Sequence, residues 1–238
     1  YAEPSASESK EGVLKIRIST GEKSRVATEK AKKICAVSEN QMAVLHMECI
    51  NEDEIIDNVG MSAVQAKYWI TLYDTEEGKK QWSSVPYTVS GYTIPETLLL
   101  RDMEINGELK KVLVVSAKDR IQLIDAENGT VIREGIFRED IVNVVQADKR
   151  RLLVGLSDGS VMIGTVEDMS ANTEVGSVSG KILDFTFSPE HQQVIWTMKS
   201  GKRLVFGEKQ TDQQMKSVNL EKENDVDSVK YTTWTDQK

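Results

Sequence analysis

The sequence predicts an all-β protein. Short runs that alternate apolar and polar residues are separated by turn residues from Gly12 to the end of the chain, which is typical of successive strands. Similar runs also recur along the chain. No long apolar segment has the 3.6-residue period of a packed helix, and segment 52–66 comes closest to having one. Its acidic start and Gly60 favour a loop with a helical turn over a packed helix.

The first repeated unit is a strand, then Asp, three residues and Gly, then a second strand. It occurs in 67–82 (KYWITLYDTEEGKKQW) and 119–134 (DRIQLIDAENGTVIRE), and 13–26 has the same cadence with a Ser-Thr-Gly turn. We expect the Asp side chain to bond nearby backbone amides and the Gly to take a positive φ. The residues concerned are Asp74 with Gly78 and Asp125 with Gly129.

The second repeated unit is an apolar strand, a short polar turn and another strand. It occurs in 110–125, 150–164 and 191–207, with Asp158-Gly159 and Ser200-Gly201 as turn residues. The two units alternate with a period of about 40–45 residues, the length of a propeller blade of four short strands. The repeats are a half repeat at 12–27, full repeats at 31–83, 94–135, 139–176 and 179–216, and a last strand or two at 226–236.

These repeats resemble degenerate WD40 repeats over about residues 12–216. FSPEHQQVIWTMKSGKRLVFG (187–207) is similar to the family's inner run, and VGLSDGSVMIG (154–164) to its middle hairpin. Tyr73-Asp74 and Ile124-Asp125 stand where the family has Trp-Asp, and no Gly-His pair opens any repeat. EEGKKQW (76–82) also resembles the Asp, Gly, Trp cadence of quinoprotein-like propellers.

The resemblance implies a β-propeller of four-stranded antiparallel blades. Residues 1–11 are expected to be a flexible leader and 12–238 the propeller domain or a propeller fragment. In one interpretation the terminal half repeats complete one blade and close a five-bladed ring. In the other, the chain is part of a six- or seven-bladed ring.

Composition and motifs give no sign of an enzyme. The net charge of −8 argues against general binding of nucleic acid, and we read the basic run 149–151 as a solvated loop. Metal-ligand spacings, a Gly-x-Ser-x-Gly elbow and a phosphate-binding loop are all lacking, so we expect no catalytic residues, cofactor or metal. The sequence has no stretch of about 18 apolar residues, so we expect no membrane-spanning helix in it.

The resulting hypothesis is a non-catalytic scaffold, a subunit of a multiprotein complex that binds other protein chains or peptides. The candidate partner-binding residues are Trp82, Tyr87, Tyr92 and Arg101, because Trp, Tyr and Arg dominate interface hot spots. The two tyrosines lie in a connection, 85–95, that could equally be the outer strand of a blade, and Trp82 could equally be packed inside.

Two alternatives stay open. One is a quinoprotein-like sensor or ligand-binding protein in the ER lumen or another extracytoplasmic compartment, which a disulfide between Cys35 and Cys49 would support. The other is a half-propeller that another chain or segment completes. Two unbonded, buried thiols would instead fit the expected intracellular, cytoplasmic or nuclear, location.

Overall fold

The computed structural model describes residues 13–27, 31–50, 65–90, 97–169, 173–177, 182–188, 193–198, 203–206 and 217–220. These residues form nineteen β-strands, and no helix occurs among them. The all-β prediction is therefore confirmed. The predicted leader (1–11), the predicted helical turn within 52–66 and the last predicted strands (226–236) lie wholly or largely outside the described residues.

The strands form five antiparallel sheets that follow one another in chain order. The first sheet has only two strands, and each of the others is four strands wide. In sequence the strands are β1 (Val13–Ile16) and β2 (Lys23–Ala27); β3 (Ala31–Ser38), β4 (Gln41–Cys49), β5 (Gln65–Asp74), β6 (Lys80–Ser83) and β7 (Tyr87–Ser90); β8 (Thr97–Ile105), β9 (Glu108–Ala117), β10 (Arg120–Asp125) and β11 (Val131–Ile136); β12 (Ile141–Gln146), β13 (Arg151–Leu156), β14 (Ser160–Thr165) and β15 (Thr173–Ser177); β16 (Ile182–Ser188), β17 (Gln193–Met198), β18 (Arg203–Phe206) and β19 (Ser217–Leu220).

The grouping of strands into sheets follows the repeats predicted from the sequence. Each later sheet is a meander in which neighbours in the chain pair with each other. The second sheet contains one extra strand, because β6 and β7 share the same edge of β5: β6 pairs with Thr71–Tyr73 and β7 with Gln65–Tyr68. The connection 85–95 thus contributes an outer strand, which is the second of its two interpretations.

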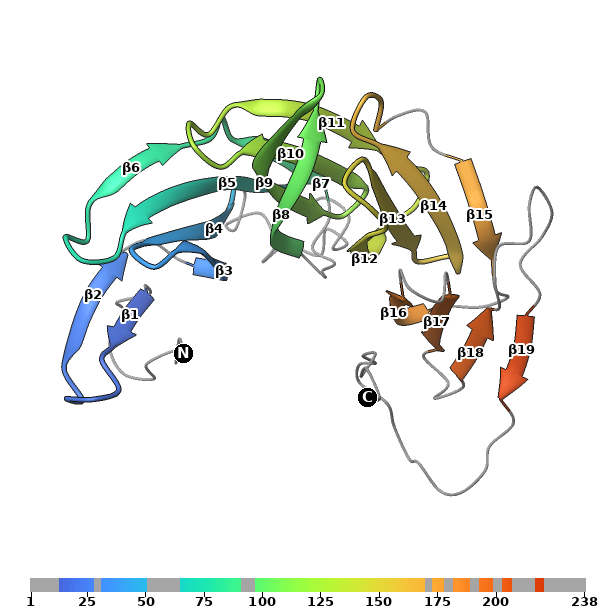
Figure 1. The fold of residues 1–238 in the computed structure, drawn as a ribbon, viewed down its shortest axis with the longest axis horizontal. Coiled ribbons are helices and arrows are strands. Elements are labelled where there is room, and N and C mark those ends of the chain that lie inside the picture. The colour runs from blue at the N-terminus through green and yellow to red at the C-terminus, as the bar shows by residue number, and fades with distance from the viewer. Residues whose placement is uncertain are drawn as a thin grey trace, which may run out of the picture.

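The sheets are arranged side by side along an open arc (Figure 1). The first strands of successive sheets contact one another, β3 with β8, β8 with β12 and β12 with β16. In Figure 1 β3, β12 and β16 lie toward the concave side of the arc, where β8 also starts, and the fourth strands β11, β15 and β19 lie toward its outer rim. The described sheets do not close a ring, because β1–β2 and β16–β19 stand at opposite ends of the arc. The five-bladed closure is therefore not found.

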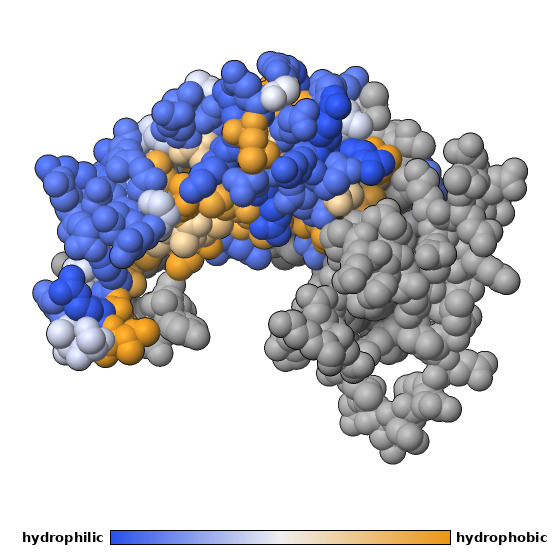
Figure 2. All heavy atoms as spheres, in the orientation of Figure 1, coloured by the Kyte–Doolittle hydropathy of each residue, from blue (hydrophilic) through white to orange (hydrophobic). Residues whose placement is uncertain are grey.

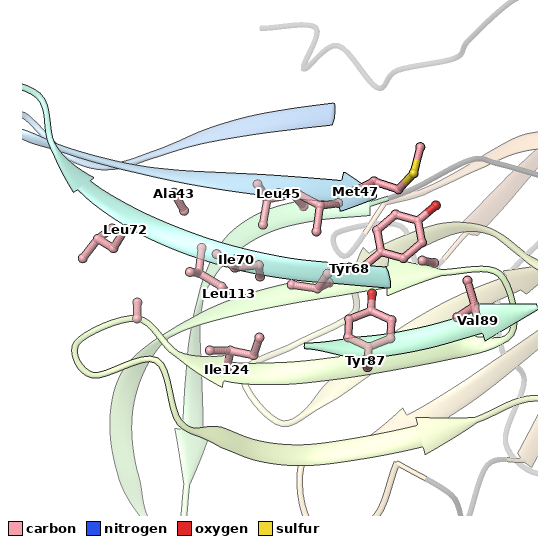
Figure 3. Close-up of a cluster of buried hydrophobic side chains, with 14 of the residues drawn as sticks. Ala43, Leu45, Met47, Tyr68, Ile70, Leu72, Tyr87, Val89, Leu113 and Ile124 are labelled. Carbon is pink, nitrogen blue, oxygen red and sulfur yellow. The ribbon is translucent and has the colours of Figure 1, made fainter. Parts of the chain in front are cut away.

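The core lies between the faces of neighbouring sheets. One buried cluster joins the second sheet to the third, and Figure 3 shows Leu72 and Ile70 of β5 directed toward Leu113 of β9 and Ile124 of β10. A second cluster joins the third sheet to the fourth and includes Met103 and Val154. Burying a side chain of this size stabilises the fold by about 1.5–3 kcal/mol, so these interfaces hold the arc together.

The turns have the chemistry expected from the sequence. The carboxylate of Asp74 accepts the N–H groups of Glu76 and Glu77 at 2.8 and 2.9 Å. Gly78 and Gly129 have φ of 67° and 77°, which any other residue adopts only with strain. Local sequence therefore specifies the geometry of these turns, because the residues concerned lie within five positions of each other.

The cross-strand disulfide is not formed. Cys35 aligns with Ala43 of β4, whereas Cys49 lies six positions further along that strand. Six residues of strand span roughly 20 Å, and a disulfide needs Cα atoms about 5.5–6 Å apart. Both side chains are thiols, and burial raises the pKa of the Cys35 thiol, although a backbone hydrogen bond at Leu100 and the charge of Arg101 act in the opposite direction.

Candidate protein-binding surface

The two-stranded sheet at one end of the arc corresponds to the third and fourth strands of a complete sheet. Its connecting turn has the same hydrogen bond as the turns after β5 and β10. The N–H of Gly21 donates to the carbonyl of Arg17 at 2.7 Å, and the N–H groups of Gly78 and Gly129 donate to the carbonyls of Asp74 and Asp125 at 2.9 Å. Strands β1 and β2 thus stand where β5 and β6, and β10 and β11, stand in their sheets.

One face of this sheet is covered by the neighbouring sheet. Val13 and Val26 are buried against Val44 and Tyr73. On the same face, the Lys15 ammonium donates to the Glu76 carboxylate at 2.5 Å and to the Thr75 carbonyl at 3.3 Å. The short sheet is therefore packed into the arc by both apolar contacts and a charged pair.

The opposite face of the short sheet is uncovered. Counting from the shared turn, Ile16 occupies the repeat position of Tyr73 and Ile124. The side chain of Ile16 is 38% exposed, whereas Tyr73 and Ile124 are 6% and 0% exposed. Ile18, in the turn, is 89% exposed. The difference arises because a preceding sheet covers Ile124 and Tyr73, and no described sheet covers Ile16.

Hydrophobic side chains also gather along the concave edge of the arc, while the face toward the viewer and the outer rim are mostly hydrophilic (Figure 2). The end that carries β1 and β2 shows a separate hydrophobic group beyond the arc's polar face (Figure 2). Ile16 and Ile18 are the large exposed apolar residues of this end. An uncovered apolar surface rimmed by polar residues is typical of an interaction site.

Trp82, a candidate partner-binding residue, packs inside the protein. Its half-buried indole lies on β6 against the core between the second and third sheets. A Cβ atom on Gly129 would lie 2.5 Å from Cε3 of this indole, so the ring rests directly on the glycine backbone. The ring joins two sheets, and this packing was the other interpretation of Trp82.

Tyr87, a second candidate, is also internal. It is 7% exposed, and its ring centroid lies 5.8 Å from that of Tyr68 on β5. The guanidinium of Arg120 stands 5.9 Å from the ring centroid of Tyr87. The surface role proposed for Tyr87 does not fit this position.

Of the other two candidates, Arg101 lies within the described residues and Tyr92 does not. Arg101 is half-buried on β8, where its guanidinium donates to the carbonyl of Leu100 at 2.7 Å and its charge acts on Cys35 of β3. It therefore lies where the first strands of two sheets, β3 and β8, meet. The structure does not bring the three described candidates together into one surface patch.

A charged groove of about 510 Å³ lies at the ends of β8 and β14. It includes the basic run that the sequence placed in a solvated loop, and two of these charges are compensated. Arg150 donates to Glu167 at 2.9 Å, and Arg151 donates to Asp148 at 2.5 Å. Mutual neutralisation leaves little net positive field for a phosphate backbone.

These pairs shift the pKa values of the acids. The hydrogen bond from Arg150 holds the pKa of Glu167 below its usual value. Partial burial of Asp148 opposes its ionisation, but hydrogen bonds from the Arg151 side chain and the Arg150 amide outweigh this and hold the pKa of Asp148 below its usual value. Glu167 and Asp148 are therefore both ionised near neutral pH.

The residues that the sequence interpretation missed are Ile16 and Ile18. Aligning IRISTG (16–21) with YDTEEG (73–78) and IDAENG (124–129) would have identified Ile16 as a core position. Two observations could have indicated that Ile16 is exposed. One is that alignment, and the other is the absence of a preceding repeat in the described residues. Sequence periodicity alone did not distinguish a covered strand from an uncovered one.

Within the described ranges, no cluster of His, Cys, Asp and Glu has the geometry of a metal site. The same residues contain no helix long and apolar enough to cross a membrane. Comparison of the chain with protein-family models and with curated proteins finds no match.

Proposed function

We propose that this chain is a segment of a β-propeller that serves as a non-catalytic platform for protein–protein contacts. The radial order of the sheets supports the propeller: four-strand-wide meanders stand side by side, and their first strands contact in succession on the concave side. WD40-like repeats remain the family proposal, on the sequence resemblance described above. Fold alone does not decide function, so the proposal depends on the surface.

The exposure of Ile16 is the observation that carries this function. The same repeat position is buried in the second and third sheets, each of which has a preceding sheet, at 6% and 0% exposure, and is 38% exposed at the end of the arc. Full burial of a Val, Leu or Ile supplies about 1.5–3 kcal/mol, and Ile16, at 38% exposure, forgoes roughly a third of it. A protein contact at this end would recover that free energy, which favours assembly with another polypeptide.

The quinoprotein-like alternative is favoured by one observation, the packing of Trp82 on Gly129. The contact joins two residue types of the Asp, Gly, Trp cadence, with the Trp in one sheet and the Gly in the next. It explains how sheets are held together, and it adds no cofactor site. The two thiols, Cys35 and Cys49, remove the disulfide that would have supported an oxidising compartment, and we propose an intracellular location for the chain.

Affinity purification of the intact protein from its native cells tests the platform. We expect a fixed set of stoichiometric partner chains, with chemical crosslinks to the end of the arc, where Lys23, opposite Ile16, supplies a reactive amine. Recovery of the protein alone, monomeric by native mass spectrometry, would contradict the proposal. Screening of cofactors and small ligands against the charged groove would then become the next step.

A further inference from the structure

We propose that Asn106 is a site of intramolecular deamidation in the folded protein, and that Asn128 is protected from the same reaction. The chain contains two Asn-Gly pairs, Asn106-Gly107 and Asn128-Gly129. Both asparagines are exposed, and each lies in a turn between two strands. This chemistry goes beyond the proposed platform and is independent of it.

The reaction joins the Asn side chain to the backbone nitrogen of the residue that follows. That nitrogen gives up its proton to hydroxide and attacks Cγ of the Asn side chain. The Cγ–N bond of the side-chain amide breaks, and its nitrogen leaves as ammonia after taking a proton from water. Water then opens the succinimide ring at either carbonyl, which gives aspartate or isoaspartate. A following glycine favours the attack, because it has no Cβ to shield its nitrogen.

The Asn106-Gly107 pair is open to this attack. It forms the two-residue turn between β8 and β9, and its φ values of 53° and 83° fit a type I′ turn. Gly107 is exposed, and its N–H donates no hydrogen bond within the described residues. Nothing lies within 4 Å of the position of its Cβ. The peptide group between the two residues can therefore rotate toward Cγ of Asn106 without breaking a contact.

The Asn128-Gly129 pair is held in place by three sets of contacts. The N–H of Gly129 donates to the carbonyl of Asp125 at 2.9 Å, so this nitrogen is hindered from losing its proton. The side-chain oxygen of Asn128 accepts the N–H and the hydroxyl of Thr130 at 2.9 and 2.7 Å. The ring of Trp82 lies directly on Gly129. Attack at Asn128 therefore requires this turn to open locally first.

Deamidation at Asn106 changes the hairpin tip beside the contact between the third and fourth sheets. The N–H of Glu104 donates to the carbonyl of Lys149 at 2.7 Å, and the Gln146 side chain donates to the carbonyl of Asp102 at 2.9 Å. Isoaspartate adds a methylene group to the backbone of a two-residue turn, whose length fixes the strand register. Aspartate keeps the backbone length and tolerates a left-handed φ. We therefore expect isoaspartate to loosen this contact more than aspartate does.

Peptide mapping of the full chain by mass spectrometry tests the assignment. The chain is incubated at physiological temperature and mildly alkaline pH, sampled over time and digested with trypsin under mildly acidic conditions. Trypsin places the two asparagines in separate fragments, 102–110 and 121–133. Synthetic peptides of the same two sequences give the rate of each site without tertiary structure. Deamidation is measured from the mass gain of each fragment and from the separate elution of its isoaspartate form.

Asn106 should deamidate in the folded chain at a rate close to that of its free peptide. Asn128, compared with its own peptide, should be slowed at least about tenfold more than Asn106, because its turn must open first. Asn128 is thus a matched control within the same molecule. Amide hydrogen exchange at Glu104 should be faster in the isoaspartate form than in the fresh chain. Circular dichroism establishes that the incubated chain stays folded.

Gly107→Ala makes the site specific. The added Cβ shields the nitrogen at position 107, so this variant should slow deamidation at Asn106 and leave the rate at Asn128 unchanged. An Asn106 that stays unmodified in the folded chain while its free peptide reacts would overturn the proposal, because the turn would then be closed to attack. Equal protection of the two sites would also overturn it. Neither result bears on the platform, which depends on the recovery of partner chains.

Discussion

The indole of Trp82 rests on the backbone of Gly129 and links the outer strand of one sheet to a turn of the next. A Cβ atom on Gly129 would lie 2.5 Å from Cε3 and 2.8 Å from Cδ2 of that ring. Related contacts recur between the other sheets. The carbonyl of Arg25 would lie 3.3 Å from a Cβ on Gly78, and Arg133 donates to the carbonyl of Glu167 at 3.2 Å. One position of the fourth strand thus joins each of the first three sheets to the next.

Gly129→Ala should destabilise the protein by about 2–5 kcal/mol. The added methyl group would clash with the Trp82 ring, and overpacking of this kind costs about 1–3 kcal/mol. A left-handed conformation costs a non-glycine residue about 1–2 kcal/mol more. Urea unfolding followed by tryptophan fluorescence measures the change in the free energy of unfolding.

Gly107→Ala is the matched control for that prediction. Gly107 has φ of 83° in the β8–β9 turn, and nothing lies within 4 Å of the position of its Cβ. Only the conformational cost of about 1–2 kcal/mol is expected. Equal losses in the two variants would mean that the Trp82 contact contributes nothing.

Trp82→Ala should lower the free energy of unfolding by about 2–3 kcal/mol. Loss of a fully buried Trp costs about 3–5 kcal/mol, but this ring is half-buried. Its Nε1 is buried and has no hydrogen-bond partner in the described part of the chain, so its removal also relieves a desolvation cost. A double-mutant cycle with Gly129→Ala should give a coupling of at least about 1 kcal/mol. Additive losses would contradict the contact.

Ile124→Ala and Ile16→Ala should differ strongly, although they occupy the same repeat position. Ile124 is 0% exposed, and its truncation should cost about 2–5 kcal/mol. Ile16 is 38% exposed on the uncovered face, and we expect a loss below about 1 kcal/mol for the isolated chain. Thermal unfolding of both variants checks this. A loss for Ile16→Ala as large as that for Ile124→Ala would show that its side chain is covered.

Asp158 should make stability depend on pH in the acid range. Partial burial opposes its ionisation, but hydrogen bonds from Ser160 and the charge of Arg138 prevail and hold the pKa of its carboxyl below its usual value. A depressed pKa in the folded state means stability that is present above about pH 4, the unfolded value, and is lost as pH falls through the folded value. Urea midpoints between pH 2 and 7 should therefore fall at low pH, and less so in Asp158→Asn. Identical pH profiles would contradict the assignment.

The chain should not bind nucleic acid through the basic run of its charged groove. Arg150 and Arg151 are paired with Glu167 and Asp148, and the whole chain carries a net charge of −8. Fluorescence anisotropy with a labelled DNA duplex at physiological salt should show no saturable binding. Glu167→Gln, which frees Arg150, is the variant in which weak binding is expected. Binding by the parent chain would contradict the neutralised groove.

Turns were the most predictable part of the structure. Asp-x-x-x-Gly segments placed the ends of β5 and β10 correctly, and Asp158-Gly159 placed the turn before β14, where Gly159 has φ of 98°. These features depend on residues close together in the chain. Tyr87 and Trp82 were harder to place, because an aromatic residue in an outer strand can face either solvent or the adjacent sheet.

Strand order, repeat boundaries and turn geometry follow from the amino-acid sequence alone, because side chains within a few residues of each other decide them. Exposure was decided only in the tertiary structure. Ile16 and Ile124 share a local sequence setting, yet one is on the surface and the other in the core. The physical reason is that an apolar face is buried only when another sheet packs against it, and contact between sheets joins residues far apart in the chain.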